Sequence, residues 1–218
     1  MKAVKKFLLV LIVSICFLSL AIPTRAQNKT INAIADATIS AFSPDYNQGE
    51  RTDVLIGEFN GAQNEAVIMF NLTTEFINFT KAELWFEVMS LESPMKLEFY
   101  EMASFWTESS VTWNNAPPAV SFIANLSVSE AIVYKVNITS AVEYKTGPWS
   151  VKIRSSDLSW VRIACKETTS DELRLQIRFD HQELIGTDLS LFLFISILIG
   201  SIVIVALMRR EMRIMSSL

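Results

Sequence analysis

Residues 82–89 read AELWFEVM, and this stretch decides the fold class. Small or apolar side chains occupy every second position of it: Ala82, Leu84, Phe86 and Val88. Near the end of the domain the period returns in Leu173, Leu175, Ile177 and Phe179. A period of two places alternate side chains on opposite faces of a strand, one buried and one solvated. The pattern therefore predicts antiparallel β-sheet.

Further strands of mixed apolar and β-branched composition lie between these two. We predict them at residues 37–42, 53–59, 66–72, 96–102, 132–137, 149–154 and 160–165. Turn residues separate them, as in Ser43-Pro44-Asp45 and Asn60-Gly61. Only residues 139–145 suggest a short helix. Many short strands with regular turns predict one all-β domain, an antiparallel β-sandwich of jelly-roll-like type.

The N-terminal segment, residues 1–26, has the order of a secretory signal peptide. Three lysines precede an apolar run from Phe7 to Ile22, and Thr24-Arg25-Ala26 offers small residues at a cleavage site. We predict cleavage before Gln27; the alternative is an uncleaved N-terminal anchor. The outer domain then spans residues 27–183.

A second apolar segment, residues 189–208, contains 20 residues without a charge. At about 1.5 Å per residue a helix of this length spans roughly 30 Å, the thickness of a bilayer core. Arg209, Arg210 and Arg213 follow it, which predicts a cytoplasmic tail at residues 209–218. We expect a single-pass protein of the cell membrane, with residues 184–188 as a juxtamembrane linker and the N-terminal domain outside. A buried core helix and a removed lipid-anchor signal are the alternatives.

The formal charge of −4 is unevenly distributed. Residues 27–188 hold 12 Lys and Arg residues against 22 Asp and Glu residues, a formal charge of −10. Such a domain repels polyanions, so we expect no nucleic-acid partner. Residues 152–178 are the one locally basic part, with six bases against four acids. Cys165 is the only cysteine outside the signal peptide, and we expect it to be buried.

Residues 106–117 read WTESSVTWNNAP. This stretch resembles the W-T-E-S-x-V-T-W-N-x-x-P hallmark of the DNRLRE domain, also classed as carbohydrate-binding module family 96. Other positions follow in the family's order: Asp36-Ala37, Pro44, Asn47, Gly49, Leu55, Gly57, residues 70–72, Val136-Asn137-Ile138-Thr139 and Lys166-Glu167. Asn137 stands where the family usually has Asp, and Lys166 where it has Arg.

The resemblance covers roughly residues 35–179. It implies a β-sandwich of the kind found on secreted and surface proteins, some of which bind polysaccharides. Its motif residues in this chain are Trp106, Thr107, Glu108, Val111, Thr112, Trp113 and Asn114.

Candidate ligand contacts are aromatic or basic. Trp106 and Trp113 could stack on sugar rings or pack in the core, and Tyr46, Trp149 and Trp160 lie beside predicted loops. Lys152, Arg154, Arg162 and Lys166 could contact an anionic ligand or solvate the closing strands. We predict no catalytic residues: the single histidine, His181, lies close to the predicted linker, where we expect a solvated linker residue, although carboxylates such as Glu98 with Glu101 are numerous.

Two further kinds of site follow from composition. Asp36, Asp45 and Asp53, with Glu50 nearby, could bind a structural calcium ion, since calcium prefers several oxygen ligands; otherwise they form a solvated acidic loop, and no other cofactor is expected. Five sequons predict glycosylation of the outer domain, at Asn28, Asn71, Asn78, Asn125 and Asn137.

Three functions remain open. The first is a membrane-anchored surface module for carbohydrate binding or adhesion, with a polysaccharide or a surface glycoprotein as partner. The second is a structural subunit of a cell-surface coat without a glycan ligand. The third, a polysaccharide-processing enzyme, lacks a recognisable catalytic cluster. A groove lined by exposed aromatic side chains would favour the first, and buried tryptophans the second.

Overall fold

Strand β5 (Lys81–Leu91) follows the predicted alternation. In the computed structural model, which describes residues 26–73, 79–167 and 175–182, Ala82, Leu84, Phe86 and Val88 are at most 1% exposed. Glu83 and Glu87 lie between them and are only half-buried. The two faces of β5 therefore separate as the sequence predicts.

The described residues form eleven strands and one short helix. The elements are β1 (Ala26–Asn32), β2 (Ala35–Ser40), β3 (Asp53–Phe59), β4 (Ala62–Leu72), β5, β6 (Met95–Met102), β7 (Ala119–Val128), β8 (Val133–Asn137), α2 (Thr139–Val142), β9 (Gly147–Arg154), β10 (Trp160–Ala164) and β11 (Gln176–Gln182).

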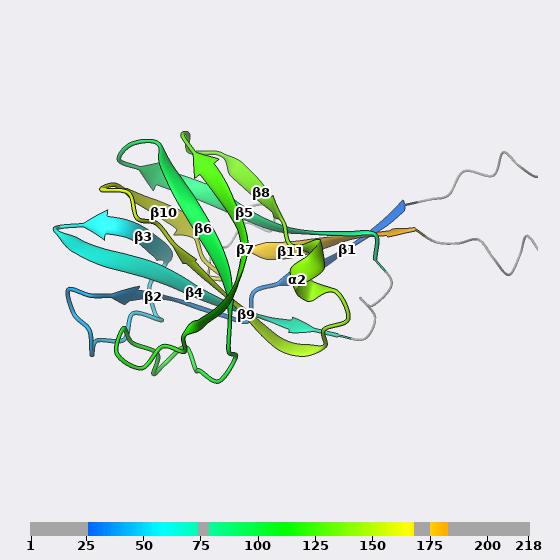
Figure 1. Cartoon of the computed structure of the whole chain (residues 1–218), viewed down its shortest axis with the longest axis horizontal. Coiled ribbons are helices and arrows are strands. Elements are labelled where there is room, and N and C mark those ends of the chain that lie inside the picture. Colours follow the sequence, from blue (N-terminus) through cyan, green and yellow to red (C-terminus); the bar gives the residue numbers. More distant parts are fainter. Residues whose placement is uncertain (1–25, 74–78, 168–174, 183–218) are drawn as a thin grey trace, which may run out of the picture. The chain divides into compact units, whose positions relative to one another are not determined.

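The strands form one curled sheet in the order β1-β11-β5-β10-β3-β4-β9-β6-β7 (Figure 1). In addition, β2 pairs with β4 and β8 with β5. The first part of β5 pairs with β8 and β11, and its last part, from Val88 to Leu91, pairs with β10. Strand β5 therefore links the two parts of the sheet. Each pairing with a described register is antiparallel, and the prediction of an all-β, antiparallel domain is confirmed.

The main core draws on both parts of the sheet. Its largest fully buried side chains include Phe70 from β4, Phe86 from β5, Phe99 from β6 and Phe179 from β11. Cys165 is also fully buried in this cluster, as expected. Burial of these side chains is the dominant favourable contribution to folding.

A second, smaller cluster lies on the opposite face of β4. Val67 and Met69 project from β4, and Ile39 of β2 packs with them. Residues of the loop after β6 complete this cluster: Trp106 and Val111 are buried in it, and Trp113 packs against it half-buried. The motif loop is therefore held in place by a hydrophobic core of its own.

Strands β1 and β7 are absent from the sequence-based prediction. β1 reads AQNKTIN, which is too polar to suggest a strand, and it pairs with β11 at the end of the sheet. β7 reads AVSFIANLSV, and irregularities in its pairing with β6 break the period of two. The helix predicted at residues 139–145 is shorter than expected, since α2 ends at Val142.

The prediction for His181 is wrong. It lies in β11 and not in a solvated linker, it is 8% exposed, and its ring centroid is 6.4 Å from that of Phe179. β11 begins at Gln176 and continues to Gln182, so the closing strand lies further along the chain than the alternation at residues 173–179 suggests.

Residues Gln27–His181 form one compact unit. Within the described ranges, no helix is long and apolar enough to cross a membrane. Several predictions fall outside these ranges: residues 1–25 of the signal peptide, the linker at 184–188, the span at 189–208 and the tail at 209–218.

Candidate functional site

Trp106, the first residue of the motif, is a core residue. It is 9% exposed, and its Nε1 donates to Ser150 Oγ of β9 at 3.1 Å. A buried tryptophan usually finds an acceptor for its N–H in this way. Of the two roles left open for Trp106, the structure shows the core role, in which the side chain fixes the motif loop to the sheet.

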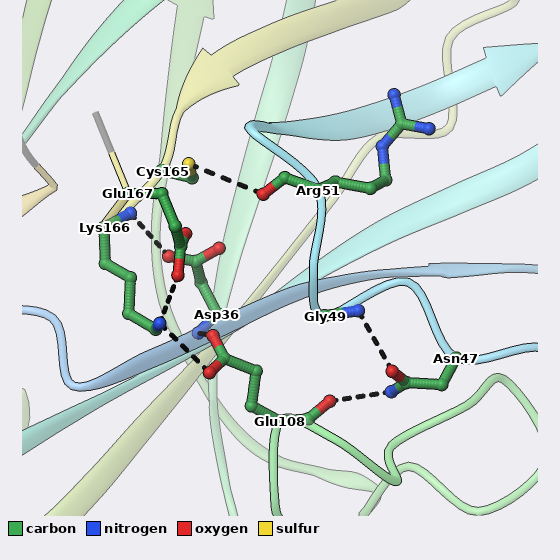
Figure 2. Close-up of polar contacts among 8 residues, drawn as sticks. All are labelled: Asp36, Asn47, Gly49, Arg51, Glu108, Cys165, Lys166 and Glu167. Atoms are coloured by element: carbon green, nitrogen blue, oxygen red, sulfur yellow. Dashed lines mark hydrogen bonds and ion pairs between the residues drawn. The ribbon is translucent and has the colours of Figure 1, made fainter. Parts of the chain in front are cut away.

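Glu108, the third residue of the motif, joins three distant segments (Figure 2). Its Oε1 accepts from the backbone N–H of Asp36 at 3.0 Å, and its Oε2 lies 3.1 Å from Lys166 Nζ. Its carbonyl accepts from Asn47 Nδ2 at 2.7 Å. Gly49 passes so close that an added Cβ would lie 2.3 Å from Glu108 O. We call Asp36, Asn47, Glu108, Lys166 and Glu167 the polar clasp.

Burial and ion pairing shift the pKa values of two groups in the polar clasp, Asp36 and Lys166. Asp36 is 2% exposed, and its Oδ2 accepts from the backbone N–H of Lys166 at 2.7 Å. Desolvation raises the pKa of the Asp36 carboxyl to about 7, and the neighbouring Glu167 and Glu108 add to the rise. The Lys166 ammonium pairs with Glu167 and Glu108, and the hydrogen bond to Glu167 is the main cause that raises its pKa.

The other motif residues also make structural contacts. The Thr107 carbonyl accepts from the N–H of Val111 at 3.0 Å, which closes a turn. Asn114 binds the preceding loop, since its N–H donates to Pro44 O at 3.1 Å and its Nδ2 to Asp45 Oδ1 at 2.8 Å. The motif thus builds and anchors a loop.

The three aspartates of the predicted calcium site have separate partners. Asp45 binds Asn114, Asp53 pairs with Arg51 and Arg162, and Asp36 lies in the polar clasp. Among the described residues, Asp36, Cys165 and Glu167 do bring potential ligand atoms within 4.8 Å of one another. Lys166 lies beside this group and pairs with Glu167, so a cation is already present there. Asp36, Asp45 and Asp53 therefore do not converge on one ion.

Each of the four basic candidates lies near a carboxylate. The pairs are Lys152–Glu65 at 3.3 Å, Arg154–Glu98 at 3.3 Å, Arg162–Asp53 at 2.8 Å and Lys166–Glu108 at 3.1 Å. Strands β3 and β4 separate β9, which holds the first two, from β10. The four residues therefore lie on two separated parts of the sheet, each with acidic partners, and their contact with an anionic ligand stays a prediction.

The remaining aromatic candidates differ in exposure. Trp149 is 3% exposed and packs against Phe70 in the main core, so its ring is not open for stacking, and its role as a ligand contact stays a prediction. Tyr46 is 67% exposed. Trp113 and Trp160 are half-buried, and Trp160 makes an edge contact with Phe59 at 5.7 Å.

The described residues include a groove of about 650 Å³ beside the start of β9. It is lined by Glu101, Met102, Ala103, Ser104, Phe105, Tyr144, Lys145, Thr146, Pro148 and Trp149. Phe105 is 92% exposed and Tyr144 80% exposed. Ligand pockets in proteins commonly have volumes of about 300–1,000 Å³ and combine aromatic walls with a few polar groups. We call this feature the aromatic groove.

The polar groups of the aromatic groove lie close together. Lys145 Nζ pairs with Glu101 Oε1, and Ser121 Oγ donates to Glu101 Oε2 at 3.2 Å. Among the described residues, Trp149 Nε1 is buried and has no hydrogen-bond acceptor. An unmatched buried donor costs about 1–3 kcal/mol.

Sequence reasoning missed Phe105, Tyr144 and Lys145. Phe105 precedes the motif directly, and its exposure could not be told from a core role. Tyr144 has a φ of 62°, a left-handed conformation that is unusual for a bulky residue. In the sequence, the feature that could have drawn attention to Tyr144 is its position shortly before the Gly147-Pro148 turn. Such strained positions cluster at binding sites.

Three of the predicted glycosylation sites lie on the surface. Asn71, Asn125 and Asn137 are exposed. The side chain of Asn28 and the whole of Asn78 fall outside the described part of the chain.

The antiparallel β-fold and its aromatic groove define a β-sheet binding module. The chain belongs to carbohydrate-binding module family 96, which matches residues 27–179. This family assignment confirms the resemblance of the motif and extends it over nearly the whole outer domain. No curated protein matches the sequence.

Several solved structures are similar to this chain. The K3 adhesin domain of Lys-gingipain from Porphyromonas gingivalis is 11% identical with a TM-score of 0.34, covering 69% of this chain and 98% of that one. A family 29 carbohydrate-binding module from Piromyces equi is 8% identical with a TM-score of 0.31, covering 70% and 90%. A xylan-binding domain from Paenibacillus barcinonensis is 10% identical with a TM-score of 0.28, covering 70% and 97%. The family match, and not these structures, assigns the class.

Proposed function

We propose that this protein is a non-catalytic surface module that binds a neutral glycan in the aromatic groove. Family membership supports carbohydrate as the ligand class. The groove supports the place, because Phe105 and Tyr144 expose aromatic faces on which the apolar face of a pyranose can stack. Hydroxyl groups of the sugar would then meet the polar pair of Glu101 and Lys145.

The single observation that carries this proposal is the exposure of both aromatic side chains at one groove. Large side chains that stay exposed contribute nothing to the core, and paired exposed aromatics commonly mark interaction sites. The buried state of Trp106 and Trp149 favours the alternative, a structural subunit without a glycan ligand. The two functions predict different results for substitutions in the groove. A glycan-binding module should lose affinity for its glycan, whereas a structural subunit has no such affinity to lose.

The test uses the full chain, purified in a detergent without a sugar headgroup so that the detergent cannot compete. A glycan array identifies the best neutral ligand, and calorimetry measures its affinity. We expect Phe105→Ala and Tyr144→Asn to weaken binding at least tenfold, about 1.4 kcal/mol. Asparagine tolerates the left-handed backbone of position 144. The control is Phe42→Ala, which removes another exposed aromatic, 75% exposed and outside the groove. Equal affinity of all three variants, or no ligand on the array, would favour the structural alternative.

The membrane anchor and the outside position of the domain are part of the same proposal. They rest on the uncharged run at residues 189–208 and the three arginines that follow. Protease added to intact cells should remove the domain and spare the C-terminal tail. A domain that survives this treatment in intact cells, but not after lysis, would contradict the topology.

A further inference from the structure

Strand β7 lies at the end of the sheet order and pairs with one neighbour, β6 (Figure 1). It is ten residues long, and most of its side chains are exposed. Its final residue, Val128, is buried where the chain turns toward β8. Within the described part of the chain, no second strand pairs with β7. The outer backbone edge of residues 119–125 is therefore open to another strand.

This edge has few of the features that usually prevent strands from pairing. Proteins protect edge strands with charged side chains, prolines or a covering segment. Among the strands that the structure describes, β7 alone has no ionisable side chain. Pro117 and Pro118 precede β7 but do not interrupt it. Val120 and Phe122 are 68% and 54% exposed, so apolar surface accompanies the open edge.

We propose that β7 is a dimerisation strand, which pairs antiparallel with β7 of a second copy of this chain. A two-fold axis makes one strand its own antiparallel partner, so a single surface suffices. Charge also favours a second copy at this edge. Like charges on a strand would face each other across a two-fold axis, whereas β7 has no ionisable side chain, so local charge repulsion is least at this edge.

The proposed pairing has a consequence for ligand binding. Ser121 of β7 donates to Glu101, and Glu101 lines the aromatic groove. Pairing through β7 therefore places two grooves beside one interface. Two linked sites bind a polymer more tightly than one site does. This consequence rests on the proposed function, whereas the dimer itself does not.

The primary test measures the molar mass of the full chain in detergent by light scattering over a dilution series. All variants include Asn125→Gln, so that a glycan at this exposed position of β7 cannot block the edge. We expect a dimer for the parent and at least tenfold weaker dimerisation for Phe122→Lys, because two copies would oppose like charges at the axis. The control is Leu158→Lys, since Leu158 is 84% exposed and lies between β9 and β10. Thermal melting verifies that each variant is folded.

A cysteine scan of residues 119–125 tests the geometry. In an antiparallel two-fold pair, a cysteine at the axis forms a disulfide with its own copy, and yield falls on both sides of that position. We expect one maximum within the scan. A monomeric parent, a dimer that Phe122→Lys leaves intact, or disulfide yields without a maximum would overturn the proposal. A dimer that persists with both lysine variants would assign association to another part of the chain.

Discussion

The backbone N–H of Lys166 donates to Asp36 Oδ2 at 2.7 Å, across 130 residues of sequence. This bond joins the segment after β10 to strand β2, and Glu108 joins both to the motif loop. The positions that carry the family resemblance are thus largely the positions that connect the three segments. The proposed ligand site, the aromatic groove, includes Phe105, which directly precedes the motif.

The first prediction concerns the pH dependence of stability. The pKa of Asp36 is raised from 3.8 to about 7 by burial, so the folded state holds this proton more tightly than the unfolded state does. The stabilisation is complete below pH 3.8 and is lost as pH rises through about 7. Over this window the contribution amounts to at most about 4 kcal/mol, at about 1.4 kcal/mol per pKa unit.

Asp36→Asn tests this prediction, because asparagine stays neutral at every pH. We expect its free energy of unfolding to rise relative to wild type between pH 5 and pH 8, measured by urea denaturation at each pH. The control Glu50→Gln removes an exposed acid of the following loop, for which the structure gives no ion pair among the described residues, and reports the effect of net charge. A difference between Asp36→Asn and wild type that stays constant with pH would contradict the raised pKa.

The second prediction concerns Gly49. An added Cβ would lie 2.3 Å from Glu108 O and 2.9 Å from Glu108 C, both backbone atoms that cannot move without disturbing the polar clasp. We expect Gly49→Ala to destabilise the domain by about 3 kcal/mol or more, in the range of severe overpacking. Gly61→Ala is the control: its Cβ meets no atom within 4 Å, but its φ of 75° is unfavourable for alanine. It should cost about 1 kcal/mol. Equal losses would show that the close approach at Gly49 relaxes.

The third prediction concerns the faces of β5. Leu84 is fully buried in the main core, and an unpaired carboxylate there costs several kcal/mol. We expect Leu84→Asp to unfold the domain at room temperature, as measured by circular dichroism. Glu87→Lys changes a charge on the opposite, half-buried face of the same strand and should leave the melting temperature within a few degrees. A stable Leu84→Asp variant would reverse the assignment of the faces.

Period and turn residues were sufficient to predict most strands. β3 occurs at its predicted bounds, and β9 and β10 differ by at most two residues, because runs of apolar and β-branched residues mark these strands. β7 could not be predicted in this way, since its apolar residues stay on the surface and its pairing is irregular. His181 is predicted outside the last strand because the alternation of apolar residues ends at Phe179, whereas β11 continues to Gln182.

The candidate site was harder to predict than the fold. The residue type makes each tryptophan a candidate sugar contact. Trp106 and Trp149 are also large apolar residues that suit a core, and only the packing of the folded chain decides between these two roles. The partners of the four basic residues could not be predicted either, because each meets a carboxylate contributed by a distant segment. Phe105 and Tyr144 come together only through the fold, and the sequence separates them by 39 positions.

The last prediction concerns the charge of the glycan. Residues 27–188 have a formal charge of −10, and Glu101 places a carboxylate within the aromatic groove, paired with Lys145. A uronic-acid polymer would meet like charge over a Debye length of about 8 Å at physiological salt. We therefore expect neutral polysaccharides to bind with an affinity that changes little between low and high salt. Uronic-acid polymers should bind weakly at low salt.

Two variants separate the possible sources of anion binding. Lys145→Gln removes the cation of the groove and should reduce any affinity for a uronic-acid polymer, while neutral binding changes less. The second variant replaces four cations outside the groove by glutamine: Lys152, Arg154, Arg162 and Lys166. Its thermal melting is measured as well, because Lys166 belongs to the polar clasp and its loss could destabilise the domain. Tight, salt-sensitive binding of a uronic-acid polymer that survives both changes would contradict a neutral ligand, because no cation considered for the site would then account for it.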